Sequence, residues 1–189
     1  MVERASPFAE DVQAERAGIT LSAVPRGSVW QVACWADTFD AVQKELGAVC
    51  GCTMPEPGQI AITSDGRSLI RVEPLKWWII GGQDAECPLQ PGPEQGAWLD
   101  LSHDQAAIAI QGANAAELVK RMVSIDLREA AFPNQSYATT EMHHMITRVL
   151  RQDTDGPCYQ IWVMRSYADT LREITAEHLH HFDLRFGLD

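Results

Sequence analysis

The sequence predicts an α+β fold with largely antiparallel sheets, arranged as two halves that each run strand, helix, hairpin. Two observations lead to this fold class. Segments with period-two apolar residues alternate along the chain with segments of helical period. Short turn sequences separate neighbouring strand segments, and such turns join antiparallel strands, whereas parallel strands need long crossovers.

The first half spans residues 28–81 and opens with a strand and a helix. Ser28–Trp35 alternates between apolar and other residues, so its apolar side chains share one face. Asp37 stands where an N-cap is expected, and the apolar residues after it recur at helical spacing. The expected inward-facing residues of this helix are Phe39, Val42, Leu46 and Val49.

A hairpin and a further strand complete the first half. Ile60–Thr63 and Leu69–Val72 flank an Asp65-Gly66 step, which is typical of a tight hairpin turn. Lys76–Ile80 follows as another strand.

The second half spans residues 97–182 and begins in the same order. Gln105–Ile110 predicts a strand that ends near Gly112. Asn114 is expected to cap a helix, with Glu117 at the capping-box distance. The expected apolar face of this helix consists of Leu118, Val119 and Met122.

A hairpin and a last helix end the second half. Glu141–Leu150 and Tyr159–Met164 are expected to pair across the turn sequence Asp155-Gly156-Pro157. Ser166 is expected to cap the helix, with Asp169 at the capping-box position. Its expected inward-facing residues are Tyr167, Leu171, Ile174 and Leu179.

Two segments lie outside these halves. Residues 1–27 form an N-terminal arm in this interpretation, and loop 82–96 joins the halves. Three prolines between Gly81 and Gly96 prevent a ladder or a helix there. Because a loop this long in a small domain is usually functional or disordered, we expect it to contact a partner.

Composition and charge exclude several classes of protein. A formal net charge of −11 repels phosphate, so nucleic acid and anionic membranes are poor partners. No stretch approaches the ~18 consecutive apolar residues of a membrane span. The first residues also lack the apolar run, roughly 7–15 residues long, of a signal peptide. We therefore expect a soluble cytoplasmic protein.

Neither the cysteines nor the histidines have the spacing of a metal site. Cys50-Gly-Cys52 is the only close cysteine pair, and no matching second pair exists. His143 and His144 are adjacent on an expected strand and would point to opposite faces. His178 and His181 fall near the end of a helix, where an imidazolium interacts favourably with the helix dipole.

The sequence also lacks a recognisable catalytic or cofactor motif. Neither G-x-G-x-x-G nor G-x-x-x-x-G-K-[ST] occurs, so the chain has no recognisable cradle for FAD or NAD. Ser102-His103-Asp104 contains the residue types of a catalytic triad, but adjacent side chains seldom reach its geometry. A turn before the strand at Gln105 accounts for them. We expect no catalytic, cofactor-binding or metal-binding residue on this chain.

The tryptophans favour a docked subunit. Trp77 and Trp78 are adjacent on a strand and face opposite sides, so one enters a core and the other needs cover. The chain has six tryptophans, a residue enriched at protein interfaces.

Three groups of residues carry a resemblance to a known family, over roughly Ser28 to Leu179. Arg71-Val-Glu-Pro74-Leu-Lys-Trp77 resembles the R-x-x-P-x-x-W stretch of the aminomethyltransferase-like folate-binding superfamily. Trp98-Leu-Asp100-Leu-Ser102-His103, before a strand ending in glycine, resembles its D-x-S segment. Ile125-Asp126-Leu, Phe132-Pro133 and Arg165-Ser166-Tyr-Ala168 are similar to the gamma subunit of heterotetrameric sarcosine oxidase.

The resemblance implies one aminomethyltransferase-like domain over residues 28–189 and partnership with alpha, beta and delta subunits. Such a complex oxidatively demethylates sarcosine to glycine, with tetrahydrofolate as a one-carbon acceptor. Its other subunits hold the FAD, FMN, NAD, zinc and tetrahydrofolate. The matching residues of this chain are then structural or interface residues: Arg71, Pro74, Trp77, Trp78, Asp100, Ser102, Arg165 and Ser166.

Three alternatives stay open. The chain could be the equivalent subunit of an N-methylglutamate dehydrogenase-type complex. It could be a free-standing folate-dependent one-carbon transferase, for which Asp100 is the only candidate for the acidic group aimed at folate. It could also be a plain binding domain with an unrelated partner.

Overall fold

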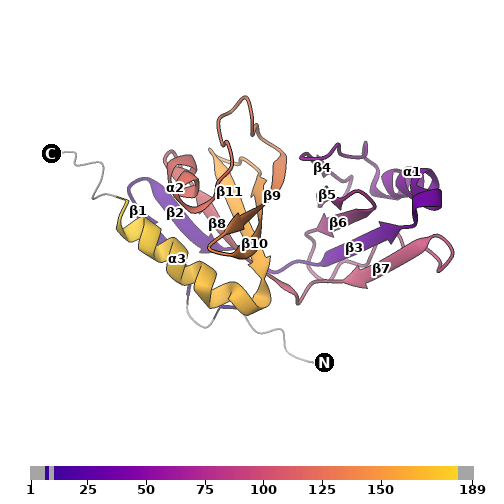
Figure 1. The fold of residues 1–189 in the computed structure, drawn as a ribbon, viewed down its shortest axis with the longest axis horizontal. Coiled ribbons are helices and arrows are strands. Elements are labelled where there is room, and N and C mark those ends of the chain that lie inside the picture. The colour runs from indigo at the N-terminus through magenta and orange to yellow at the C-terminus, as the bar shows by residue number, and fades with distance from the viewer. Residues whose placement is uncertain (1–6, 9–10, 183–189) are drawn as a thin grey trace. The chain divides into compact units, whose positions relative to one another are not determined.

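The computed structural model describes residues 7–8 and 11–182, which fall into two compact units (Figure 1). Unit 1 combines residues up to Val24 with those from Asp104 onward, and unit 2 is Pro25–His103. Each unit contains an antiparallel sheet with helices, which confirms the α+β class. Among the described residues, no helix is long and apolar enough to span a membrane.

Unit 2 is a five-stranded antiparallel sheet with one helix. The strand order is β4-β5-β6-β3-β7. Its elements are β3 (Val29–Cys34), α1 (Phe39–Cys50), β4 (Ile60–Ile62), β5 (Ser68–Glu73), β6 (Lys76–Ile80) and β7 (Gly96–Asp100). The strand, helix and hairpin expected for residues 28–81 are all present.

The core of unit 2 lies between α1 and one face of the sheet. Val42 and Leu46 of α1 are buried in one cluster with Val32, Trp77 and other sheet residues. Val49, expected to face inward, is 47% exposed instead. The helix ends at Gly51, whose φ of 62° is the left-handed conformation that glycine adopts most readily.

In its described residues, unit 1 is a six-stranded antiparallel sheet with two α-helices. The strand order is β1-β2-β8-β11-β10-β9. Its elements are β1 (Ala14–Arg16), β2 (Ile19–Ala23), β8 (Gln105–Gln111), α2 (Ala115–Met122), β9 (Ser136–Met142), β10 (Met145–Arg151), β11 (Cys158–Met164) and α3 (Ala168–His180). Both helices contact β8 and β11, and their apolar faces complete one core with the sheet.

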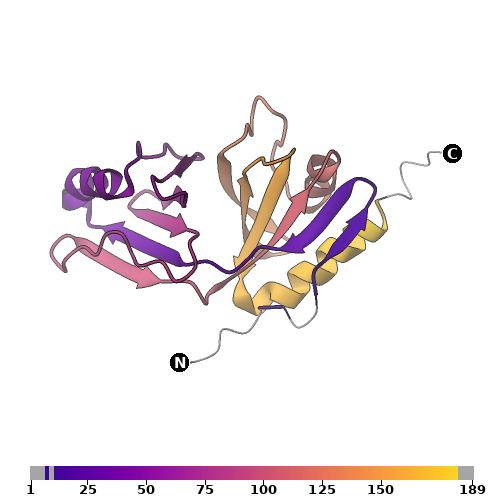
Figure 2. The ribbon, with the colours of Figure 1, turned by 180° about the vertical axis from the view of Figure 1, so that it is seen from behind.

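The first 27 residues are not the arm that we expected. β1 and β2 form a hairpin, and β2 pairs with β8, so the described part of this segment is an edge of the unit 1 sheet (Figure 2). Ile19 and Leu21 are buried while Thr20 between them is exposed. The alternation is genuine, but it covers only a few residues and is easily overlooked.

The histidine pair in unit 1 turns the chain rather than continuing a strand. We expected one strand from Glu141 to Leu150, but β9 and β10 are separate strands that pair across His143-His144. Both histidines have positive φ, 47° and 64°. Two-residue turns of this kind usually contain Asn-Gly, so the sequence did not mark the turn.

The expected helix caps in unit 1 are also replaced. Asn114 precedes α2 but makes no cap bond, and Glu117 pairs with Lys120 rather than completing a capping box. Ser166 lies in a 3-10 turn, Arg165–Tyr167, before α3. Tyr167, expected to face inward, is 41% exposed because it precedes the helix.

The border between the two units differs from the expected joint at residues 82–96. β7 pairs with β3 along its whole length, so Gly96–Asp100 belongs to the sheet of unit 2 and not to the second half. The loop therefore connects two strands of one sheet, β6 and β7, and the chain passes between the units at residues 24–25 and 103–104.

Candidate functional site

The Arg71 side chain bonds to the Pro74 backbone at the turn between β5 and β6. Nε and Nη2 of Arg71 donate to the Pro74 carbonyl oxygen at 3.2 and 2.6 Å. The guanidinium lies 4.9 Å from the ring centroid of Phe39 and 6.0 Å from that of Trp77. These are cation–π distances, so Arg71 links the hairpin to α1 and the core. A shallow pocket of about 270 Å³ adjoins it, lined by Pro57, Arg71, Val72, Glu73 and Pro74.

Trp77 and Trp78 are both buried, with 0% and 3% of their surface exposed. Trp77 stacks on Phe39 at a centroid distance of 5.6 Å within the core of unit 2. Trp78 Nε1 donates to the Gln31 side-chain oxygen at 3.2 Å. The tryptophans that do lie at the surface are Trp35 and Trp98, which are 48% and 42% exposed.

The Asp100-to-Asp104 segment is a turn, and its polar groups bond to the backbone. Asp100 Oδ1 accepts the Ser102 N–H at 2.8 Å. Ser102 Oγ accepts the Val29 N–H at 3.0 Å, which fixes the end of β7 to β3. The side-chain oxygens of Asp100 and Ser102 thus each accept a backbone N–H group. The other matched pair, Arg165 and Ser166, begins the 3-10 turn, where the Arg165 N–H donates to the Asp104 carbonyl at 2.7 Å.

Three long side chains hold the loop between β6 and β7 in place. Trp30 Nε1 donates to the Ala85 carbonyl at 2.7 Å, and Trp35 Nε1 donates to the Pro93 carbonyl at 2.8 Å. Arg67 Nη1 donates to the Glu86 carbonyl at 3.0 Å. The sequence does not predict these anchors, because hydrogen bonds between residues this far apart in the chain leave no local pattern.

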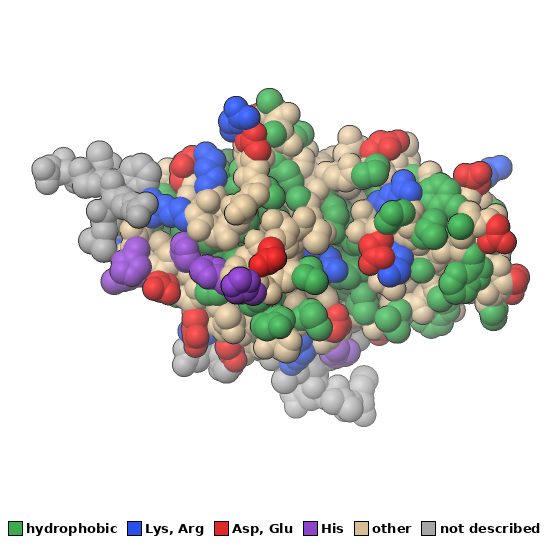
Figure 3. Space-filling model, viewed as in Figure 1, with side chains coloured by type: hydrophobic (Ala, Val, Ile, Leu, Met, Phe, Trp, Pro, Cys, Tyr) green, Lys and Arg blue, Asp and Glu red, His purple; other side chains and the backbone are tan. Residues whose placement is uncertain are grey.

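Apolar side chains gather at the exposed edge of the unit 2 sheet. Trp35, Trp98 and Leu99, which we call the edge surface, are 48%, 42% and 53% exposed. Trp98 packs on Trp30 with ring centroids 5.5 Å apart. Figure 3 shows green hydrophobic side chains over the end of this unit that carries α1 and β7. This surface is the strongest candidate for a functional site in the described residues.

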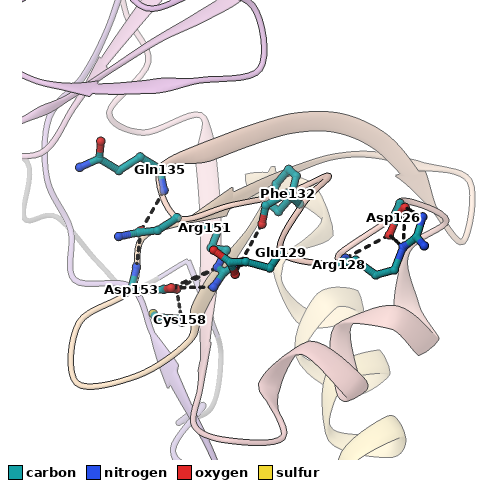
Figure 4. A network of polar contacts seen from close by, with 9 residues as sticks. Asp126, Arg128, Glu129, Phe132, Gln135, Arg151, Asp153 and Cys158 are labelled. Atoms are coloured by element: carbon teal, nitrogen blue, oxygen red, sulfur yellow. Dashed lines mark hydrogen bonds and ion pairs between the residues drawn. The ribbon is translucent and has the colours of Figure 1, made fainter.

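Arg151 is the centre of a buried polar network in unit 1 (Figure 4). Nη1 donates to Glu129 Oε2 at 2.5 Å and to the Phe132 carbonyl at 2.7 Å, while Nη2 donates to Asp153 at 2.8 Å. Hydrogen bonding to Asp153 raises the pKa of Arg151 above its usual range, although burial opposes the shift. Asp153 also accepts the Cys158 N–H at 3.2 Å. The network joins the connection before β9 to the turn after β10, which is a structural role.

The thiols are not activated nucleophiles. All five cysteines are free, and burial raises the pKa of each thiol, to about 11 for Cys50. A catalytic thiol needs the opposite shift, because the thiolate is the reactive form.

The histidines gather on unit 1 without forming a metal centre. The rings of His143 and His178 lie 5.9 Å apart, and those of His180 and His181 lie 5.1 Å apart; purple side chains mark this region in Figure 3. His143 and His144 line an open pocket of about 370 Å³. Within the described residues, no three His, Cys, Asp or Glu side chains could hold a metal ion together.

The start of α2 does not fit a dinucleotide phosphate. Such a site needs an open, glycine-containing turn between a strand and a helix. Among the described connections that lead from a strand into a helix, only the one between β8 and α2 contains a glycine, Gly112. A Cβ there would lie 2.2 Å from the Gly18 carbonyl oxygen, and Asn114 Nδ2 donates to the Ala17 carbonyl at 2.9 Å. The β1–β2 turn therefore packs directly against the start of α2.

Comparisons with known proteins place the fold. No family model matches the sequence, and no curated protein matches it. The structure is similar to a chain of heterotetrameric sarcosine oxidase from Corynebacterium sp. U-96, with a TM-score of 0.80 and 19% identity over 95% of this chain and 96% of that one. The chain thus has the fold of a chain of that oxidase.

A second neighbour extends the aminomethyltransferase-like likeness. The structure matches the glycine cleavage system aminomethyltransferase T from Bartonella henselae with a TM-score of 0.57 and 14% identity. The match covers 85% of this chain but 46% of that one, so this chain spans less than half of the aminomethyltransferase. The expected aminomethyltransferase-like fold is confirmed.

Proposed function

We propose that this chain is a non-catalytic accessory subunit, of the gamma type, in a heterotetrameric sarcosine oxidase complex. The observation that carries the proposal is the match over nearly the full length of both chains to a chain of such an oxidase. In this complex, sarcosine is oxidatively demethylated to glycine, and tetrahydrofolate accepts the one-carbon unit.

The chemistry of the described residues supports an accessory role. The side chains of Asp100 and Ser102 bond to the backbone of a turn, and burial raises the pKa values of the thiols. The β1–β2 turn packs against Gly112, just before α2. We propose that the alpha, beta and delta subunits hold the FAD, FMN, NAD, zinc and tetrahydrofolate. The cytoplasm is the proposed location, without nucleic acid or membrane partners.

Co-expression tests the proposal. The chain is tagged and produced with the alpha, beta and delta subunits of its own organism, and the purified material is examined for flavin absorbance and sarcosine turnover. We expect all four chains to co-purify with flavin, and the chain alone to retain no flavin after dialysis. Flavin retained by the isolated chain, or an alpha–beta–delta complex that never takes up this chain, would contradict the proposal.

Substrate choice separates the second candidate. The equivalent subunit of an N-methylglutamate dehydrogenase-type complex would share this fold, so the purified complex is assayed with both N-methyl amino acids. Turnover of N-methylglutamate but not sarcosine would select that complex. A free-standing one-carbon transferase would instead show folate-dependent activity without any flavin subunit.

A further inference from the structure

The outer edge of β7 is open. β7 is the last strand of the unit 2 sheet, and no described strand pairs with its far side. The bonds from Leu101 N–H to the Val29 carbonyl and from Trp35 N–H to the Gln95 carbonyl, 2.8 and 3.1 Å long, fix which residues bond to β3. In an antiparallel ladder these residues alternate, so the N–H and C=O groups of Trp98 and Asp100 point outward.

Apolar side chains flank this edge on both faces of the sheet. Trp98 pairs with Val32 and shares its face, whereas Leu99 pairs with Gln31 on the other face. Both are exposed, and the edge therefore offers backbone hydrogen bonds between two apolar contacts. This is the arrangement by which a sheet accepts an added strand.

The other sheet edges are shorter or more polar than β7. Proteins guard edges with short strands, proline or charged side chains. β4 and β1 have three residues each, and Pro57 precedes β4. β9 is longer, but Thr139 and Glu141 are its exposed residues. β7 has five residues and no proline or lysine, and its exposed residues are Ala97, Trp98, Leu99 and Asp100, which carries its only charge.

The charge around the edge indicates the chemistry of the occupant. Residues 77–103, which include the loop and β7, contain four acidic residues and no Lys or Arg. β3 has no charged residue at all. A segment with basic side chains complements this surface, and an acidic one is repelled.

We infer that β7 binds an extended segment of another subunit, which adds a strand to the unit 2 sheet through alternating apolar and basic side chains. The inference rests on the proposed function, because the segment belongs to a partner in that complex. Trp30, Trp35 and Arg67 anchor the loop that leads into β7. Because this loop is already fixed, binding of the segment orders few further residues of this chain.

Two variants at the edge test the inference in the co-expressed complex. Leu99→Lys places a like charge against a basic segment, and Leu99→Glu does not. We expect Leu99→Lys to weaken binding of this chain to the other subunits at least about tenfold, and Leu99→Glu to weaken it less. Trp98→Pro removes an outward N–H but keeps the ladder to β3, and should weaken binding similarly.

Ile146→Lys is the matched control, since Ile146 is 64% exposed and lies in unit 1. It should change affinity less than about twofold, and thermal unfolding of each variant verifies its fold. Hydrogen exchange supplies a direct readout: the amides of Trp98 and Asp100 should become protected in the complex.

The outcomes separate the two proposals. If the unaltered chain does not join the complex, the proposed function fails. If it joins, but the Leu99 and Trp98 variants join equally well and the two amides stay unprotected, the docking inference is wrong. A dimer of this chain alone that buries β7 would also overturn it, by making a second copy the occupant.

Discussion

Replacing Arg151 with methionine should strongly destabilise unit 1. The Arg151 side chain is 8% exposed, and its loss leaves two acceptors without their donor: the Phe132 carbonyl and the Asp153 carboxylate, which is 21% exposed. Each buried acceptor left unpaired costs about 1–3 kcal/mol. Glu129 is 71% exposed, so water replaces its bond at little cost. We expect a loss of about 2–4 kcal/mol in the free energy of unfolding, because methionine retains part of the packing.

Thermal unfolding followed by circular dichroism measures this loss. Each kcal/mol lowers the Tm of a domain of about 100 residues by roughly 4–8 °C, so the expected loss corresponds to a drop of roughly 8–32 °C. Arg128→Met is the matched control, because Arg128 also pairs with an aspartate two residues away, Asp126, but is 79% exposed (Figure 4). Its Tm should not change measurably. Equal losses in both variants would show that burial does not decide the strength of these pairs.

Three further predictions address pH, thiol reactivity and assembly. Hydrogen bonds from Arg67 and Thr63 hold the pKa of Asp65 at about 2, below its usual 3.8. The stabilisation by the Asp65 carboxylate is therefore present above about pH 4 and is lost as the pH falls through about 2. Asp65→Asn should lower the free energy of unfolding at neutral pH, and the difference between the variant and the unaltered protein in denaturant titrations should vanish near pH 2. Cys50, with a pKa of about 11, should react with iodoacetamide at pH 8 about a hundredfold more slowly than an ordinary thiol, and an equal rate in the folded and urea-unfolded chain would refute this. Trp77→Ala should lower the free energy of unfolding by about 3–5 kcal/mol and reduce the yield of assembled complex, without changing turnover per flavin. A hundredfold loss of turnover per flavin in a fully assembled complex would instead place this subunit in the active site.

The sequence predicts best the elements with a clear apolar pattern. β3 and α1 were located within a residue or two because apolar residues recur along each at the strand or helix period. β6 and β8 were located equally well, as short, nearly continuous apolar runs that are buried on both faces. The hairpin turn at Asp65-Gly66 was equally clear, since Gly66 has a φ of 83° that other residues seldom adopt.

The missed elements lack such a pattern. β1 and β2 are too short to show a period, and β7 has exposed side chains on both faces. None of these three strands can be told from a loop by an alternation of apolar and polar residues. The His143-His144 turn has positive φ at both residues but lacks the Asn-Gly or Asp-Gly step that usually marks such a turn in the sequence. β2 and β7 also depend on pairing with strands that lie far away in the sequence, β8 and β3.

The same reasoning applies to the candidate site. The motif residues could be found from the sequence, and Arg71 bonds to a backbone carbonyl, as expected for a charged residue beside the core. The edge surface could not be found, because it depends on β7 being the last strand of its sheet and on which side its amides face.

The long loop and the open edge have one structural explanation. β6 and β7 lie on opposite sides of β3, so the chain must pass the end of β3 to reach the edge, and residues 81–95 make that crossing. Three anchoring hydrogen bonds then hold a segment that three prolines keep out of regular structure. The loop also contributes to the core of unit 2, because Cys87 and Leu89 are buried in one cluster with Val32 and Trp77. The loop therefore completes the core and at the same time places β7 at the edge, where its outward backbone groups are suited to binding another strand.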